Sequence, residues 1–229
     1  MARPSGPAAA HDGTARNADG DGAGRRTAPD GTVAKTGTTT VGIAATNGVA
    51  LAADRRASLG GRFVANKGVD KVEQVHPSAA MTLSGSVGDA QAVVRQLRSE
   101  ASLYEARRGR PLSMDALARV AGDLLRGAPV TPVLGGVDGD GTHVYDLDGG
   151  GGVMADDYAA TGSGMQVAYG VLERQYEPDA DLDGAVAAAA DAVAAASERD
   201  TASGNGVLVA RVTADGVAFE THDDPTEVA

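Results

Sequence analysis

The sequence contains no cysteine and no tryptophan, and aromatic residues make up 3% of its 229 residues. The absence of cysteine excludes a disulfide framework, thiol catalysis and thiolate metal sites. No two histidines stand at a metal-binding spacing either, so we expect no metal and no cofactor. With only two phenylalanines among the 42% apolar residues, a core must be built from Ala, Val, Leu and Ile.

Long hydrophobic runs are also missing. No stretch of 18 apolar residues occurs, so we expect no transmembrane helix and no membrane partner. The N-terminus lacks the apolar centre of a secretory signal, because the short run Ala8–Ala10 is followed by His11 and Asp12. We therefore expect a soluble, cytoplasmic protein.

Positive charge is scarce, and the formal net charge is −11. A surface of this sign repels phosphate backbones, which argues against nucleic acid as a partner. Of the 20 basic residues only Lys35, Lys67 and Lys71 are lysines. An acidic, lysine-poor surface is typical of proteins from a high-salt cytoplasm, although a GC-rich genome produces the same bias.

Residues 1–37 differ in composition from the rest of the chain. They consist mainly of Gly, Ala, Asp, Arg and Thr, with Val33 the lone large aliphatic residue after Met1. Such a segment cannot bury enough apolar surface to offset its ordering entropy, so we expect it to be disordered. It is either a tail or a propeptide, and residues 38–229 are expected to form one domain.

The pattern of residues 38–229 predicts alternating blocks of strands and helices. A hairpin is expected over 39–46 and 49–53, with Asn47-Gly48 forming a type I′ turn. Strands are predicted near 62–65, 69–75, 79–83, 130–137, 143–147, 153–158, 207–212 and 217–220. Helices are predicted over about 90–104, 114–125, 165–176 and 181–198, from apolar residues at helical spacing. Segregated blocks indicate an α+β fold of two stacked antiparallel sheets with helices outside both.

The run Thr36-Gly37-Thr38-Thr39-Thr40 lies where the N-terminal segment meets the first predicted strand. If the Gly37–Thr38 bond is cut, Thr38 gains an α-amine within reach of its own hydroxyl. That amine titrates at roughly 7.7–8.0, close to the pH at which a general base works best. A glycine at 37 also lacks the Cβ that would crowd an attack on its carbonyl. The run predicts a self-activating amidase, but three threonines are also ordinary strand residues.

Two lysines and one carboxylate are candidates to assist Thr38. Lys67 and Lys71 follow the hairpin, and a cation beside Thr38 would keep the amine neutral and favour alkoxide character. Asp54 ends the second hairpin strand and could pair with such a lysine. The alternatives are solvated surface lysines, and an Asp54 that pairs with Arg55, Arg56 or nothing.

Three other motifs do not predict a site. Residues 161–164 (Thr-Gly-Ser-Gly) lack the further glycine and lysine positions of a nucleotide-binding loop. Asp138-Gly139-Asp140-Gly141 lacks a glutamate at the twelfth position of a calcium loop, where Gly149 falls, and is interpreted as a turn. No Gly-x-Ser-x-Gly elbow is present, so a conventional serine hydrolase fits poorly.

Seven motifs, in order, resemble those of a proteasome β subunit of the archaeal or actinobacterial kind. They are Gly37-Thr38-Thr39-Thr40-Val41-Gly42-Ile43, Asp54-Arg55-Arg56, Lys71-Val72, Ser84-Gly85-Ser86-Val87-Gly88-Asp89-Ala90-Gln91, Tyr158-Ala159-Ala160-Thr161-Gly162-Ser163-Gly164, Tyr169-Gly170-Val171-Leu172-Glu173 and Arg199-Asp200-Thr201-Ala202-Ser203-Gly204. The resemblance spans essentially all of 38–229. An insertion near Gly60-Gly61 leaves the lysine alignment ambiguous by one residue, and Lys71 matches better than Lys67.

The resemblance implies a fold and a set of roles. The fold is the four-layer αββα sandwich of the Ntn-hydrolases, and the activity is that of a threonine-type endopeptidase. A propeptide, 1–37, would be removed by autocleavage between Gly37 and Thr38. Implied catalytic residues are Thr38 (nucleophile), Asp54 and Lys71 (charge pair), Gly85 (oxyanion N–H), and Ser163, Asp200 and Ser203 (support of the amine and a water). Substrate-binding positions are Ala57, Ser58, Val69, Leu83 and Val87, which predict a preference for hydrophobic residues before the cut.

The resemblance also implies partners. Seven β subunits form a ring that stacks against rings of α subunits, an AAA ATPase regulator acts through the α ring, and the substrates are unfolded polypeptides. Two alternatives remain open, a catalytically silent ring subunit with an assembly role and an amidase of the same fold that acts on small molecules.

Overall fold

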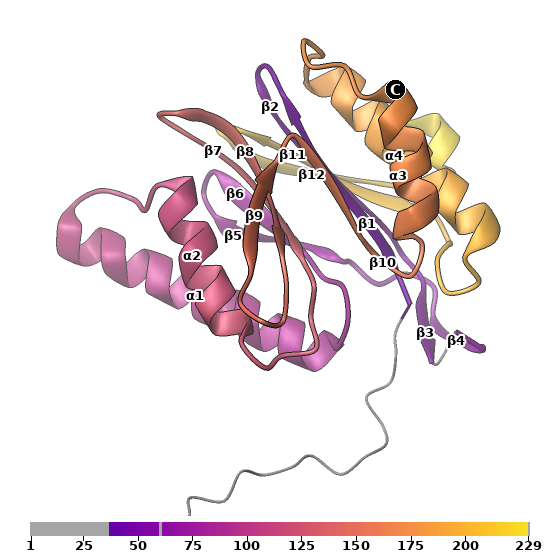
Figure 1. The fold of residues 1–229 in the computed structure, drawn as a ribbon, viewed down its shortest axis with the longest axis horizontal. Helices are drawn as coiled ribbons and strands as arrows, with labels where there is room; N and C mark the ends of the chain where they lie inside the picture. Colours follow the sequence, from indigo (N-terminus) through magenta and orange to yellow (C-terminus); the bar gives the residue numbers. More distant parts are fainter. Residues whose placement is uncertain (1–36, 60, 229) are drawn as a thin grey trace, which may run out of the picture. The chain divides into compact units, whose positions relative to one another are not determined.

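Two five-stranded antiparallel sheets, stacked face to face, form the centre of the fold (Figure 1). The computed structural model describes residues 37–59 and 61–228, which belong to one compact unit. The first sheet has the order β10-β1-β2-β11-β12, with β10 Tyr158–Gly162, β1 Thr39–Ala45, β2 Gly48–Asp54, β11 Val207–Thr213 and β12 Gly216–His222. The second has the order β5-β6-β7-β8-β9, with β5 Val72–His76, β6 Ala79–Thr82, β7 Val133–Asp138, β8 Gly141–Leu147 and β9 Val153–Asp156.

Two pairs of helices cover the outer faces of the sheets. Helices α1 (Val87–Arg108) and α2 (Met114–Leu125) lie on the second sheet, and α3 (Met165–Gln175) and α4 (Leu182–Arg199) on the first (Figure 1). A third apolar cluster fills the space between the sheets. This order of layers confirms the predicted αββα sandwich. A short hairpin of β3 (Ala57–Leu59) and β4 (Phe63–Asn66) and a 3-10 turn at Pro225–Glu227 complete the elements.

Small residues allow the layers to pack closely without aromatic side chains. Three alanines of α4 (Ala185, Ala189 and Ala192) are at most 2% exposed, in the cluster that α4 forms with β1 and β2. Between the sheets, a Cβ on Gly42 would lie 2.6 Å from Val133 Cγ1, and one on Gly135 would lie 2.7 Å from Val49 Cγ1. The scarcity of large core residues is therefore matched by short distances between the layers.

Two local predictions are wrong. The strand predicted over 153–158 is two strands, since β9 pairs with β8 and β10 pairs with β1, and the chain crosses between the sheets at Asp157. The first hairpin is present, but its turn residues are Thr46 and Asn47, and neither Asn47 nor Gly48 has a positive φ, so the turn is not type I′. The Asn47 side chain instead accepts a hydrogen bond from Leu182 N, at the start of α4, at 2.7 Å. That tertiary contact competes with the local turn preference.

Candidate active site

Three strand ends bring the predicted nucleophile and its charge pair together. Thr38 immediately precedes β1, Asp54 is the last residue of the neighbouring strand β2, and Lys71 immediately precedes β5 of the other sheet. The antiparallel pairing of β1 with β2 places the start of one beside the end of the other. All three residues are at most 5% exposed.

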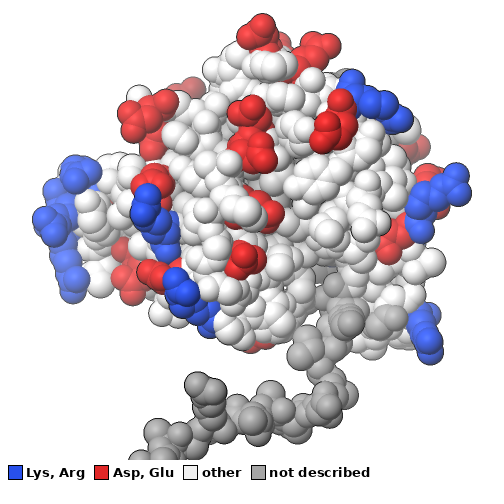
Figure 2. Space-filling view, viewed as in Figure 1, with Lys and Arg blue, Asp and Glu red and all other residues white. Residues whose placement is uncertain are grey.

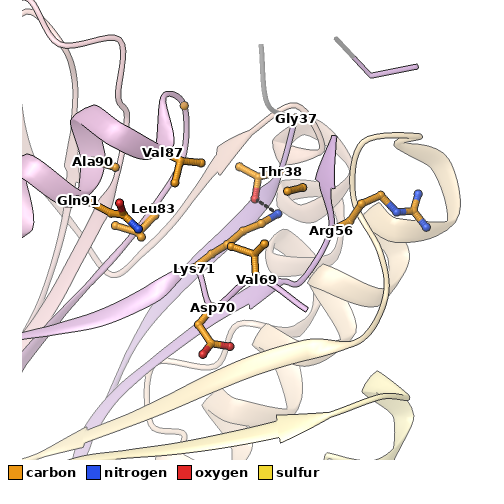
Figure 3. Close-up of a pocket in the computed structure, with 12 residues that line it drawn as sticks. Gly37, Thr38, Arg56, Val69, Asp70, Lys71, Leu83, Val87, Ala90 and Gln91 are labelled. Atoms are coloured by element: carbon orange, nitrogen blue, oxygen red, sulfur yellow. Dashed lines mark hydrogen bonds between the residues drawn. The ribbon is translucent and has the colours of Figure 1, made fainter. Parts of the chain in front are cut away.

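The three side chains are within hydrogen-bonding distance of one another. Lys71 Nζ donates to Thr38 Oγ1 at 2.8 Å and to Asp54 Oδ1 at 2.7 Å, and Thr38 Oγ1 donates to Asp54 Oδ1 at 2.9 Å. Figure 3 shows the Lys71 side chain extended toward the Thr38 hydroxyl. Lys67, the other candidate, is exposed on the loop after β4.

Burial sets the electrostatics of this group. Burial lowers the pKa of the Lys71 ammonium below its ordinary value, and the Asp54 carboxylate opposes that shift. Asp54 also accepts backbone hydrogen bonds from Thr39 N at 3.0 Å, Arg56 N at 3.0 Å and Gly204 N at 2.9 Å. A fully buried carboxylate with these donors has one fixed orientation, and it fixes Lys71 beside Thr38 in turn.

A second hydrogen-bonded chain leads away from the Thr38 nitrogen. Thr38 N donates to Ser163 Oγ at 3.1 Å, and Ser163 Oγ donates to Asp200 Oδ2 at 2.5 Å. Ser203 Oγ donates to the same Asp200 oxygen at 2.7 Å, and its oxygen lies 2.8 Å from Thr39 Oγ1. The predicted supporting residues Ser163, Asp200 and Ser203 thus form a network at the Thr38 nitrogen. Lys71 and Asp54, in contrast, contact the Thr38 hydroxyl.

The turn that carries Ser163 approaches Thr38 closely because of its glycines. Gly162 has φ +95°, and a Cβ on it would overlap the Thr38 carbonyl group. Only glycine fits this backbone conformation and this approach. The motif at 161–164 therefore contacts Thr38.

A pocket opens beside Thr38, and we call it the apolar pocket. Its lining residues are Gly37, Thr38, Arg56, Ala57, Val69, Asp70, Lys71, Leu83, Gly85, Val87, Ala90 and Gln91. Four of the five predicted substrate-binding residues are among them. The fifth, Ser58, is buried on β3 outside the lining, and its Oγ has no hydrogen-bond partner within the described residues.

Four lining residues were not predicted from the sequence. Ala90 and Gln91 lie in the first turns of α1. The helical pattern there does not distinguish pocket residues from ordinary buried or exposed helix residues. Arg56 and Asp70 point away from Thr38 in Figure 3. Arg56 donates to Asn205 Oδ1 and to the Thr201 carbonyl oxygen, which ties it to the loop after α4.

Gly85 lies between β6 and α1 at the edge of the apolar pocket. Its φ is +108°, and a Cβ there would overlap the Pro129 carbonyl oxygen. Gly85 also forms an isolated antiparallel bridge with Val130. These restraints fix its backbone close to the nucleophile.

Other classes of site receive no support from the described residues. Within 37–59 and 61–228, no group of three or more His, Asp or Glu side chains is placed to hold a metal ion. A helix long and apolar enough to cross a membrane is likewise not found in that part of the chain. Figure 2 shows acidic side chains across the middle of one face, with Lys and Arg side chains mainly at its margin. The predicted leader lies outside the described residues, except for Gly37.

Comparison with known proteins gives a consistent set of similarities. The family model described as "Proteasome subunit" matches residues 34–212. A "Proteasome subunit beta" of Halorhabdus utahensis is 62% identical over 195 residues, which cover 84% of this chain and 83% of that protein. Its counterpart in Halomicrobium mukohataei is 61% identical, over 84% and 82% of the two chains. A "Proteasome subunit beta 2" of Haloterrigena turkmenica is 58% identical, over 84% and 83%.

Proposed function

The chain belongs to the proteasome subunit family, and from that premise we propose that it is a catalytic β subunit of the core particle, a threonine-type endopeptidase. The observation that carries the proposal is the contact of Thr38 Oγ1 with both Lys71 Nζ and Asp54 Oδ1. Family membership alone does not separate active from silent subunits. A buried, hydrogen-bonded lysine–aspartate pair at the threonine hydroxyl is the feature that an active subunit needs.

Activation begins with removal of residues 1–37, leaving residues 38–229 as the mature domain. Thr38 Oγ attacks the Gly37 carbonyl carbon, the Gly37–Thr38 C–N bond breaks, and the Thr38 nitrogen takes up the proton that Oγ loses. Water then hydrolyses the resulting ester, which releases the leader as a carboxylate and restores the hydroxyl. The product is a Thr38 α-amine at the position where its nitrogen now contacts Ser163.

Peptide hydrolysis then uses the same hydroxyl. The α-amine accepts the Oγ proton as Oγ attacks the substrate carbonyl, and the Lys71 ammonium favours negative charge on Oγ. The Gly85 N–H stabilises the tetrahedral oxyanion. The protonated amine donates its proton to the departing peptide nitrogen, and water cleaves the acyl ester. Asp200, through Ser163 and Ser203, holds the amine and the attacking water in place.

The apolar pocket selects the residue before the cut. Val69, Leu83 and Val87 supply apolar walls, and Ala57 lies at its side. An apolar side chain gains about 25 cal/mol for each Å² of surface removed from water, whereas a charged one loses hydration without a partner. We therefore infer a preference for hydrophobic residues there.

The same proposal covers partners and location. Seven copies or close relatives form a ring in the cytoplasm, flanked by rings of α subunits, and an AAA ATPase feeds unfolded polypeptides through the α ring. The relatives described as proteasome subunit beta support membership of the core particle. A catalytically silent ring subunit is the second candidate. The retained contacts of Thr38 with Lys71 and Asp54 favour the active subunit, because an assembly role does not need them.

Replacement of Thr38 tests this function. The assembled complex is assayed on fluorogenic peptides with leucine, arginine or glutamate before the cut. The wild type is expected to cleave the leucine peptide, and Thr38→Ala is expected to abolish both cleavage and leader removal, while Thr38→Ser retains part of each. Hydrolysis by Thr38→Ala at the wild-type rate would contradict the proposal.

A further inference from the structure

The space beside Gly37 is closed on one side by Ala202. A Cβ on Gly37 would overlap the Ala202 Cβ, would lie 2.7 Å from Ser163 Oγ and would lie 3.4 Å from Ala202 Cα. The space around Gly37 therefore leaves no room for a side chain at this position.

Ala202 cannot easily move aside. It is 4% exposed and lies in the turn after α4. Its backbone N–H donates to Asp200 Oδ1 at 3.2 Å, and the next two residues are fixed by Ser203 Oγ on Asp200 and by Gly204 N on Asp54. The same hydrogen bonds that organise the site therefore hold the Ala202 methyl group against Gly37.

Gly37 itself lines the apolar pocket, but the three atoms nearest to a Cβ on it belong to Ala202 and Ser163 rather than to Val69, Leu83 or Val87. The residue before the cut thus meets one wall when it is part of the leader. In a peptide substrate, which is not joined to Thr38, the corresponding side chain is free to enter the apolar pocket.

We propose that Ala202 is the residue that restricts the position before the leader cleavage site to glycine. This proposal rests on the proposed self-cleavage. A larger residue at 37 is pushed away from Ala202, which displaces its carbonyl carbon from the Thr38 hydroxyl and slows the attack. The leader and peptide substrates are then selected by two different walls of one site, Ala202 for the leader and the apolar pocket for substrates.

A compensating pair of substitutions tests the proposal. The conversion of full-length chain to the form that begins at Thr38 is followed by intact mass over time in assembled complexes. Gly37→Ala is expected to slow conversion about tenfold or more, equivalent to at least about 1.4 kcal/mol in activation free energy. Adding Ala202→Gly removes the overlapping methyl group and leaves Ala202 Cα at 3.4 Å, so most of the lost rate should return. Recovery is expected to be incomplete because Ser163 Oγ stays close.

The matched control is Gly37→Ala combined with Ala57→Gly. It also removes one methyl group, but from the apolar pocket, and it should convert as slowly as Gly37→Ala alone. A second variant keeps Gly37 and replaces Ala202 by serine, which adds one oxygen at the contact and should slow conversion. In chains produced with Thr38 as their first residue, Ala202→Ser should leave peptide hydrolysis within about twofold of the wild type. Thermal unfolding of every variant checks that its fold is retained.

The outcomes separate this inference from the proposed function. Wild-type conversion of Gly37→Ala, absence of rescue by Ala202→Gly, or equal rescue by Ala57→Gly would overturn the role of Ala202. If Thr38→Ala still loses its leader at the wild-type rate, self-cleavage itself fails, whatever the Ala202 variants do. Misfolding of Gly37→Ala would leave the Ala202→Ser comparison to decide, since that variant keeps the native residue at 37.

Discussion

Removing both partners of the buried Asp54–Lys71 pair should cost much less stability than the sum of the two single removals. Lys71 Nζ and Asp54 Oδ1 are 2.7 Å apart, and their side chains are 7% and 0% exposed. Removing one partner of such a pair typically costs about 3–5 kcal/mol of stability because the other charge stays buried. Replacing both partners removes both charges and should cost much less than the sum.

The structure predicts which single variant is worse. In Lys71→Met, the Asp54 carboxylate keeps four donors, namely Thr38 Oγ1 and the backbone N–H groups of Thr39, Arg56 and Gly204. We expect a loss near the lower limit, about 3 kcal/mol. Asp54→Asn replaces one carboxylate oxygen by an NH2 group, which then faces N–H donors instead of accepting from them. It also leaves the Lys71 charge without a compensating negative charge. Its loss should be nearer the upper limit, about 5 kcal/mol.

Equilibrium urea unfolding measures the free energy of unfolding of the wild type, the two single variants and the double variant. Every chain is produced so that Thr38 is its first residue. At a slope of about 2 kcal/mol per M, the single variants should shift the midpoint by about 1.5–2.5 M. The double variant should lose about 5 kcal/mol rather than about 8, which is a coupling of about 3 kcal/mol.

The exposed Arg119–Asp115 pair on α2 is the matched control. Its side chains are 73% and 62% exposed, so its coupling should be far smaller than that of the buried pair. High salt should weaken the control coupling and leave the Asp54–Lys71 coupling unchanged, since buried charges are little screened. Additivity of the Asp54 and Lys71 variants within about 0.5 kcal/mol would refute the reasoning.

Three further predictions concern catalysis by the mature chain. Ser163→Ala removes the acceptor of Thr38 N and a donor to Asp200, so kcat/KM for an apolar peptide should fall about 10- to 100-fold with KM little changed; an unchanged kcat would argue against its role. Leu83→Glu places a carboxylate in the apolar pocket, so the ratio of kcat/KM for arginine over leucine peptides should rise, and a ratio equal to that of the wild type would exclude Leu83 as a pocket wall. The kcat/KM of the wild type should rise with pH as the Thr38 amine loses its proton, with an inflection near the roughly 7.7–8.0 of an ordinary α-amine. A pH–rate profile that is flat between about pH 6 and 8 would contradict an amine base.

Elements determined by local sequence were predicted closely. The helix expected over 114–125 has those bounds, and Ser113 Oγ accepts a capping hydrogen bond from Ala116 N. The turn expected within 138–141 is present, with residues 139 and 140 between β7 and β8. Periodicity and capping depend on neighbours in sequence, so they can be seen in the sequence alone.

Features that depend on tertiary contacts were not predictable in the same way. The chain changes sheet at Asp157 because β9 pairs with the preceding strand β8, whereas β10 pairs with β1 at the start of the domain. The local sequence around Asp157 does not indicate either pairing. The difference between Lys67 and Lys71 is likewise tertiary, because one is exposed on a loop and the other is buried against Asp54. From composition the two lysines were equivalent, and only the resemblance favoured Lys71. Ala90 and Gln91 line the pocket because the fold brings α1 beside Thr38, and the helical pattern alone does not indicate that contact.

The central claim is that Thr38, once it begins the chain, performs the hydrolysis. Its most direct test measures intact mass and peptide hydrolysis on the same samples, taken as the leader is removed. Hydrolytic rate should increase in proportion to the fraction of chains that begin at Thr38 and should be zero when that fraction is zero. Full hydrolysis by a complex in which every chain still carries residues 1–37 would contradict the account.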